Sequence, residues 1–379
     1  MIWLCLLAVG LRGADANAEI EKAKRMVARG DLQPAALLLR ELVSKEPGNA
    51  DAHLLLGTVL SLSRQRSEAL QELSRAVELR PQFAPGHYTF GVALSGFGEL
   101  EPARKAFERA LELDPKFADA HVNLAMILAH DGRFDAALEH LSQAIQVLGK
   151  DPRAANAHYL EGKMYNEQMQ PEPARRELEE AIKLRPGFGP AYYDLGRTCD
   201  NLLDTACALQ ALQKAADLMP EDGGVQYNLG LQYLRGGDAQ RALTHLQLAY
   251  RSMPAEGNVL YNLARALHRL GRDQEADPLV AKVRALTDGA NLVEAGKLNN
   301  EGTGMEDRGE LRGALEKYHA AVEISPLNTT FRRNLGLVLC RLGLWQRGVD
   351  ELKEVLRLDP NDVDATKALY IALEHTAQP

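Results

Sequence analysis

Asparagine residues recur through the second half of the chain at a spacing that could serve to bind a peptide. Asn228 and Asn262 lie 34 residues apart, and so do Asn300 and Asn334. A side-chain amide offers one donor and one acceptor group, which is what a peptide unit needs. This pattern favours non-covalent recognition of an extended peptide, although a structural consensus could also produce it. The set is Asn123, Asn228, Asn262, Asn300 and Asn334.

Aromatic and basic residues accompany the asparagines. Tyr227 and Tyr261 each precede an asparagine directly, and four arginines lie close by in the sequence. If all of them face one groove, its C-terminal half is basic and favours an acidic or carboxylate-bearing partner segment. Glu306 and Asp307 interrupt this basic series, and exposed arginines often carry only solvated charge. The arginines are Arg265, Arg269, Arg333 and Arg341.

Histidine also recurs, at His53, His87, His121 and His158. A histidine column could indicate a metal site, or it could be one bulky, half-buried position used repeatedly. Neighbouring copies would lie roughly 10 Å apart at helix-packing distances. An ion needs ligands at about 2 Å. We therefore expect a packing role and neither metal nor cofactor.

Recognisable catalytic motifs are missing from the sequence. It contains no P-loop, nucleophile elbow, HExxH, GxGxxG or calcium loop. The formal net charge of −8 weighs against nucleic acid as a partner, since phosphate binding requires a basic surface. We expect a protein that is not an enzyme and does not bind nucleic acid.

Prolines reveal the unit that must position these residues. They recur 34 residues apart in three groups, and aligning them gives ten units that begin at residues 16, 50, 84, 118, 155, 189, 223, 257, 295 and 329. Position 8 of the unit is Gly or Ala in all ten, and position 20 is Ala in nine and Gly348 in the last. Small residues there let two antiparallel helices touch, while larger apolar residues at positions 7, 11, 24 and 28 fill the space on one helical face. Glycine at position 15 in seven units suits a left-handed residue that ends the first helix.

This pattern resembles the tetratricopeptide repeat (TPR) family over residues 16 to about 362. The resemblance implies an all-α fold, a right-handed TPR superhelix of antiparallel helical hairpins with a concave groove lined by the first helices. The asparagines resemble those in the TPR groove of O-linked N-acetylglucosamine transferase, which clamp an extended peptide. The family's chaperone-binding carboxylate clamp has no matching residues in three successive units.

The unit at 257–290 is the least regular, with Pro278 deep in its second helix and four inserted residues after it. A proline there removes a backbone hydrogen bond. We predict a hinge near 277–294. The expected organisation is repeats over 19–290, an insertion or hinge at 291–294, repeats over 295–362, and a solvating capping helix and tail at 363–379 with Ala365, Leu369 and Ile371 facing inward.

The N-terminus carries an apolar run, Ile2–Leu11, which is too short to span a bilayer. With small residues at Ala16 and Ala18, it predicts a signal peptide over residues 1–18, although no Lys or Arg precedes the run. The alternative is a short apolar element docked on the first repeat. We expect a periplasmic or secreted protein, and otherwise a cytoplasmic one, without a transmembrane segment.

Cys199 and Cys207 lie eight residues apart within one repeat. A disulfide is possible in an exported protein, but we favour two buried, reduced cysteines.

Together these features predict an exported, bacterial-type scaffold or adaptor that binds extended peptides or partner proteins in its groove. A structural component of an assembly or secretion system, and a substrate-recruiting subunit of a separate enzyme such as a glycosyltransferase, are the alternatives. The sequence does not indicate the oligomeric state.

Overall fold

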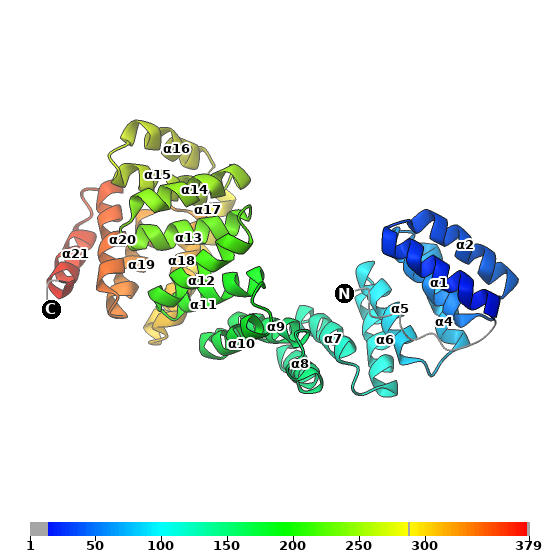
Figure 1. Ribbon diagram of the computed structural model, residues 1–379. Helices are drawn as coiled ribbons and strands as arrows, with labels where there is room; N and C mark the ends of the chain where they lie inside the picture. The colour runs from blue at the N-terminus through cyan, green and yellow to red at the C-terminus, as the bar shows by residue number, and fades with distance from the viewer. Residues whose placement is uncertain (1–13, 287–288, 377–379) are drawn as a thin grey trace. The chain divides into compact units, whose positions relative to one another are not determined.

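A computed structural model describes residues 14–286 and 289–376 of the chain, and within those residues every regular element is an α-helix (Figure 1). The predicted all-α fold is confirmed. Taken two at a time in chain order, the helices of the described residues form ten antiparallel hairpins, and one final helix follows them.

The chain divides into two compact units, with the boundary between Met164 and Tyr165, inside α9. The helices up to that boundary are α1 Ala14–Arg29, α2 Leu32–Lys45, α3 Ala50–Leu62, α4 Arg66–Leu79, α5 Ala84–Gly96, α6 Leu100–Leu113, α7 Ala118–His130, α8 Phe134–Leu148 and α9 Ala154–Glu167. Those of the second unit are α10 Pro171–Leu184, α11 Gly189–Asn201, α12 Thr205–Leu218, α13 Gly223–Arg235, α14 Ala239–Ser252, α15 Gly257–Arg269, α16 Asp273–Leu286, α17 Gly289–Asp307, α18 Leu311–Ile324, α19 Thr329–Arg341, α20 Trp345–Leu358 and α21 Val363–Thr376.

The small residues at position 8 mark where the helices of a hairpin come closest. A Cβ atom on Gly91 would lie only 2.7 Å from the ring of Phe107, which is fully buried at position 24 of the same repeat. Gly230 faces Leu246 at the same 2.7 Å. The predicted close approach is confirmed, and its partner is the large apolar residue at position 24, which fills the space left by the missing side chain.

Position 15 has a left-handed backbone in all ten repeats. The seven predicted glycines have φ between +71° and +85°. In the other three repeats Arg64, Met169 and Leu203 adopt φ of 59°, 60° and 67°. A left-handed conformation costs a residue with a side chain roughly 1–2 kcal/mol. The turn between the two helices therefore imposes this geometry even where glycine is absent.

The irregular region is helical on both sides of two residues that lie outside the described structure, 287 and 288. Pro278 stands inside α16, and residues 291–294 belong to α17, which has 19 residues. The predicted hinge therefore lies within the second unit and stays a prediction. Beyond it, α18 contacts α15, so the last two repeats pack against earlier repeats of the same unit.

The two ends of the array bear on the predicted signal peptide, which stays a prediction, and on the predicted capping helix. Residues 1–13 of the predicted signal peptide lie outside the described residues. Ala16 is buried in the hydrophobic core of the first two repeats, and the predicted cleavage site at Ala18 lies inside α1. In α21, Ala365 is buried and Leu369 half-buried as predicted, but Ile371 is 52% exposed and Ala372 takes the inner position. The inward face follows spacings of four and three residues, as helix geometry requires. In the part of the chain that the structure describes, no helix is long and apolar enough to cross a membrane.

The contact at position 8 gives a stability prediction within one helix. Gly91→Ala gains helix propensity of about 1 kcal/mol, but the new methyl group collides with the Phe107 ring. We expect a net loss of about 1–3 kcal/mol in the free energy of unfolding, measured by urea denaturation. Gly96, in the same helix, has open space around its Cβ position, so Gly96→Ala is the matched control and should be neutral or stabilising. Equal effects of the two substitutions would contradict this account of the contact.

Candidate functional site

The histidine column joins each first helix to the turn before it. In three repeats the histidine Nε2 lies 3.0–3.1 Å from the carbonyl oxygen of the recurring proline that ends the preceding repeat, as for His53 and Pro47. Gln226 and Arg332 occupy the same position and donate to Pro220 and Pro326. The residue at position 4 therefore links adjacent repeats. This agrees in outline with the packing role that the sequence predicted for it.

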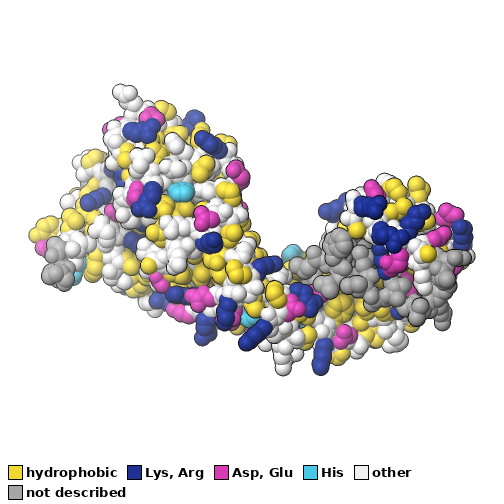
Figure 2. All heavy atoms as spheres, in the orientation of Figure 1, with side chains coloured by type: hydrophobic (Ala, Val, Ile, Leu, Met, Phe, Trp, Pro, Cys, Tyr) yellow, Lys and Arg dark blue, Asp and Glu magenta, His cyan; other side chains and the backbone are white. Residues whose placement is uncertain are grey.

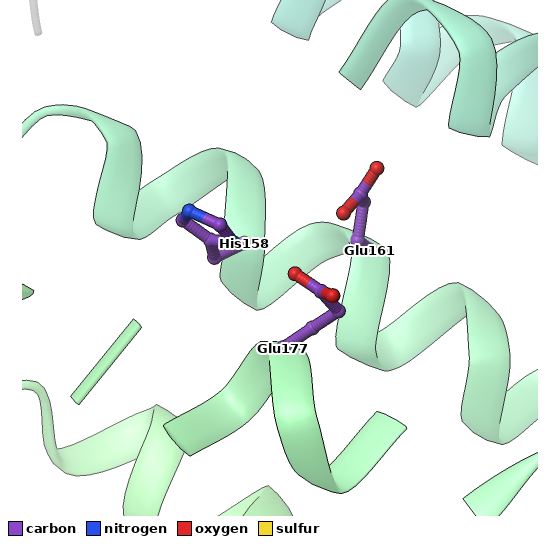
Figure 3. Close-up of side chains that lie close together, drawn as sticks. All are labelled: His158, Glu161 and Glu177. Carbon is purple, nitrogen blue, oxygen red and sulfur yellow. The ribbon is translucent and has the colours of Figure 1, made fainter. Parts of the chain in front are cut away.

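The fourth histidine of the column lies in a cluster with two carboxylates. One ligand atom each from His158, Glu161 and Glu177 lies within 4.8 Å of the others (Figure 3). Three such groups could hold a metal ion. However, His158 and Glu177 occupy the same two repeat positions as His53 and Glu72, whose Nδ1 and Oε2 atoms lie 2.5 Å apart. We interpret the cluster as a variant of that structural pair.

The five recurring asparagines, here called the asparagine ladder, use most of their amide hydrogens in hydrogen bonds within the protein. Asn262 Nδ2 donates to the carbonyl oxygen of Asn258 at 2.9 Å and to the hydroxyl of Tyr227, in the preceding repeat, at 3.1 Å. Asn123 and Asn228 make the same two bonds, with Tyr88 and Tyr193 as the hydroxyl partners. The tyrosine one repeat earlier is the signal in the sequence that could have revealed this link.

The last two asparagines differ from the others. Asn334 donates to the side-chain oxygen of Asn299 at 2.9 Å, while Asn300 is exposed on α17. Both amide hydrogens are therefore engaged at Asn123, Asn228 and Asn262. At Asn334 one of them is engaged, and Asn300 is displaced from the series.

The arginines expected to face an acidic partner already contact acidic residues of the chain itself. Arg265 and Arg269 on α15 lie 3.5 Å and 3.4 Å from Glu351 and Asp350, both on α20. The hydroxyl of Tyr261 donates to Glu354, one turn further along α20, at 2.5 Å. Helix α20 thus supplies the acidic segment that the basic series predicted for a partner. The remaining two arginines pair likewise, Arg333 with Asp362 at 2.7 Å and Arg341 with Glu306 at 2.5 Å.

The pKa values of Glu351 and Glu354 show that the neighbouring guanidiniums stabilise both carboxylates in their ionised form. Burial alone raises the pKa of Glu351, but the Arg332 and Arg265 guanidiniums outweigh it and hold the pKa at about 2. Glu354 is also buried, and Arg265 and Arg357 keep its pKa at about 2. Both groups therefore stay ionised at neutral pH, and the ion pairs with Arg265 and Arg269 join α20 to α15.

The first unit contains an open groove that the asparagine ladder did not predict. Its volume is about 310 Å³, and it is lined mainly by apolar groups of the first helices α3, α5 and α7. Small residues such as Ala93 and Gly96 leave room beside the larger Val92 and Phe97. The lining residues are Thr58, Ser61, Leu62, Arg64, Leu73, Tyr88, Thr89, Val92, Ala93, Gly96, Phe97 and Asn123. Following the asparagines along the sequence missed this groove, since only Asn123 belongs to it.

Cys199 and Cys207 form a disulfide, with their Cα atoms 5.7 Å apart. The expectation of two reduced cysteines was wrong. The tight turn between α11 and α12 brings the end of one helix beside the start of the next, which places both sulfur atoms within bonding reach.

Comparison with known proteins identifies the family. Models described as tetratricopeptide repeat match residues 26–88, 84–117, 117–187, 227–290 and 301–363. The chain therefore belongs to the tetratricopeptide repeat family, as the repeat pattern predicted. Its family and its helical-hairpin fold support a role as a protein-interaction scaffold.

Similar solved structures agree on the fold. The chain is 16% identical to PilW, a type IV pilus biogenesis factor, with a TM-score of 0.51 over 57% of this chain and 98% of that one. It is 19% identical to PilF of Pseudomonas aeruginosa, with a TM-score of 0.50 over 54% and 92% of the two chains. Among curated proteins, BBSome complex member BBS4 of Bos taurus is 39% identical over 61 residues, which is 16% of this chain and 12% of the bovine protein.

The ionised carboxylates on α20 predict acid sensitivity of the second unit. The folded pKa of Glu351 lies below its unfolded value, so its contribution is complete above about pH 5 and is lost as the pH falls toward 2. From Glu351 alone we expect a loss of about 3 kcal/mol in the free energy of unfolding over that window. The fluorescence of Trp345, which stands on α20, reports this in a Trp3→Phe background.

Glu351→Gln serves as the test of the cause. It should lower stability at pH 7, because two arginines lose their carboxylate, and it should flatten the dependence between pH 5 and pH 2. An unchanged pH dependence in this variant would show that other carboxylates account for the acid sensitivity.

Proposed function

We propose that this protein is a non-catalytic scaffold that binds an extended segment of a partner protein in the groove of its first unit. The observation that carries the proposal is the contrast between the two units. Apart from the exposed Asn300, the asparagine, tyrosine and arginine side chains predicted to bind a peptide in the second unit contact the chain itself. The groove of about 310 Å³ in the first unit is open.

The lining of the groove defines the chemistry of the ligand. Thr58, Ser61 and Thr89 each donate their hydroxyl hydrogen to a carbonyl oxygen of their own helix, at 2.7–2.9 Å. Their oxygens can therefore accept hydrogen bonds from peptide N–H groups. Val92 and Phe97 add apolar surface, so the groove suits an extended segment with aliphatic or aromatic anchors. An acidic segment, which the basic series had favoured, finds one lining cation here, Arg64.

Placing a charge in the groove tests the proposal. We expect Val92→Glu to weaken binding of peptides selected from a random display library by tenfold or more, because the carboxylate must be desolvated beside an apolar anchor. Binding is measured by fluorescence anisotropy of the selected peptides. Val77→Glu is the matched control, since Val77 is also half-buried but lies on α4, outside the groove. Selection of acidic peptides that bind both variants equally would contradict the proposal.

We also propose that the protein is exported. The apolar run over residues 2–11 and the Cys199–Cys207 disulfide support this, since disulfides persist in oxidising compartments. N-terminal sequencing of the protein from its source should find residue 19 first, and an intact Met1 would contradict cleavage.

A second candidate function, a component of an assembly, is favoured by the last helix. A capping helix normally presents a polar outer face. Helix α21 instead exposes Val363, Tyr370, Ile371 and Leu373, with Tyr370 67% exposed, and Figure 2 shows hydrophobic side chains at this end of the second unit. Large exposed apolar patches mark interaction sites.

This candidate predicts association through the C-terminal end. Light scattering should show a mass that rises with protein concentration, and Tyr370→Lys with Ile371→Lys should abolish the rise by placing like charges at the contact. Lys353→Glu, an exposed change on α20, is the control. A concentration-independent monomer would remove this candidate.

A further inference from the structure

A small charged cavity lies inside the second unit and is separate from the groove of the first. Its volume is about 60 Å³, and its walls come from α13, α15, α18, α19 and α20. That space admits a few water molecules or one small ion, and is far below the size of a pocket for a drug-sized ligand.

Guanidinium groups dominate the cavity, and they share their carboxylates. Asp200 lies 2.6 Å from Arg235 and 3.6 Å from Arg347. Glu351 contacts Arg332 and lies 3.5 Å from Arg265. Each carboxylate thus serves two guanidiniums, which leaves one positive charge in each group of three.

One further carboxylate reduces this excess without removing it. Glu323 lines the cavity and lies 3.7 Å from His319. Arg269 and Asp350, which also line it, neutralise each other. Four guanidiniums therefore face three carboxylates, and an uncompensated buried charge is unfavourable unless a counter-ion accompanies it.

Two buried hydrogen-bond donors without partners also favour a bound anion. The Nε atoms of Arg265 and Arg332 are buried, have no hydrogen-bond partner among the described residues, and belong to side chains that line the cavity. The side chain of Arg332 is only 2% exposed. A buried donor without a partner costs about 1–3 kcal/mol, and guanidinium donors match the oxygens of an oxyanion.

The excess positive charge affects the pKa of Arg347. Burial and the neighbouring Arg235 lower its pKa to about 10, although Asp200 and Glu351 act in the opposite direction. His319 Nε2 accepts a hydrogen bond from the Arg235 guanidinium at 3.0 Å. Burial and the charge of Arg235 lower the pKa of His319, so this imidazole adds no positive charge at neutral pH.

We infer that this cavity binds one small oxyanion of the carboxylate or phosphate type, held by Arg265, Arg332 and Arg347. Bound there, the anion neutralises the excess charge and accepts hydrogen bonds from the unused donors. It joins α15 to α19 and α20, so it stabilises the packing of the last two repeats against the earlier ones. This site is independent of the peptide groove proposed above.

The test is isothermal titration of the full chain with sodium phosphate and with sodium acetate, at pH 7 and constant ionic strength. We expect saturable binding with one site per chain. Arg347→Gln should weaken it by about tenfold or more, as expected for loss of a charged hydrogen bond. Lys353→Gln is the control, because Lys353 lies on the same helix, is exposed and does not line the cavity.

A second variant keeps the inference testable if Arg347→Gln fails to fold. Glu323→Gln removes the carboxylate that offsets the excess charge, so it should tighten binding of the same anion. A peptide with a free C-terminal carboxylate, compared with its amide, then distinguishes a terminal carboxylate from a free anion as the natural source. No saturable heat with phosphate, acetate or the peptide acid, or equal affinity in all variants, would overturn the inference.

Discussion

The structure depends on a close approach of two helices, made possible by one missing or minimal side chain in each repeat. Gly91 and Phe107 illustrate it, because a Cβ atom on the glycine would overlap the ring. Such a contact fixes the distance and rotation of the helices within a hairpin. The left-handed residue at position 15 then sets the turn between them, even where it is Arg64 or Leu203. With both constraints repeated ten times, each chemical group returns to the same place in every hairpin.

That regularity explains why the most regular polar residues turn out to be structural. Asn262 bonds to Tyr227, and His53 to Pro47, at positions that every repeat presents to its neighbour. A side chain that recurs at fixed spacing is well placed to join adjacent repeats. The groove of the first unit depends instead on residues that differ between repeats, such as Val92, Gly96 and Phe97. The groove of the first unit therefore lies where the residues of successive repeats differ.

Much of the fold could be predicted from the sequence, because it follows from local spacing. The small residues at positions 8 and 20, the glycines at position 15 and the inward face of α21 at Ala365 all concern contacts within a hairpin or with the next one. The pairing of Arg265 with Glu351 could not be predicted, since it joins residues 86 positions apart through the packing of the last repeats. The disulfide between Cys199 and Cys207 was missed for a different reason. Their spacing was compatible with a bond, and only the geometry of the turn decided it.

The central claim is that the second unit pairs its basic series and most of its asparagine ladder with its own side chains, so that a partner segment binds in the groove of the first unit. Amide hydrogen exchange, measured with and without a bound peptide that carries apolar anchors, tests this claim most directly. The account predicts slower exchange in α3, α5 and α7 on binding, with α13 and α15 unchanged. Protection confined to α13 and α15, together with faster exchange in α20, would show instead that the peptide displaces the chain's own acidic helix.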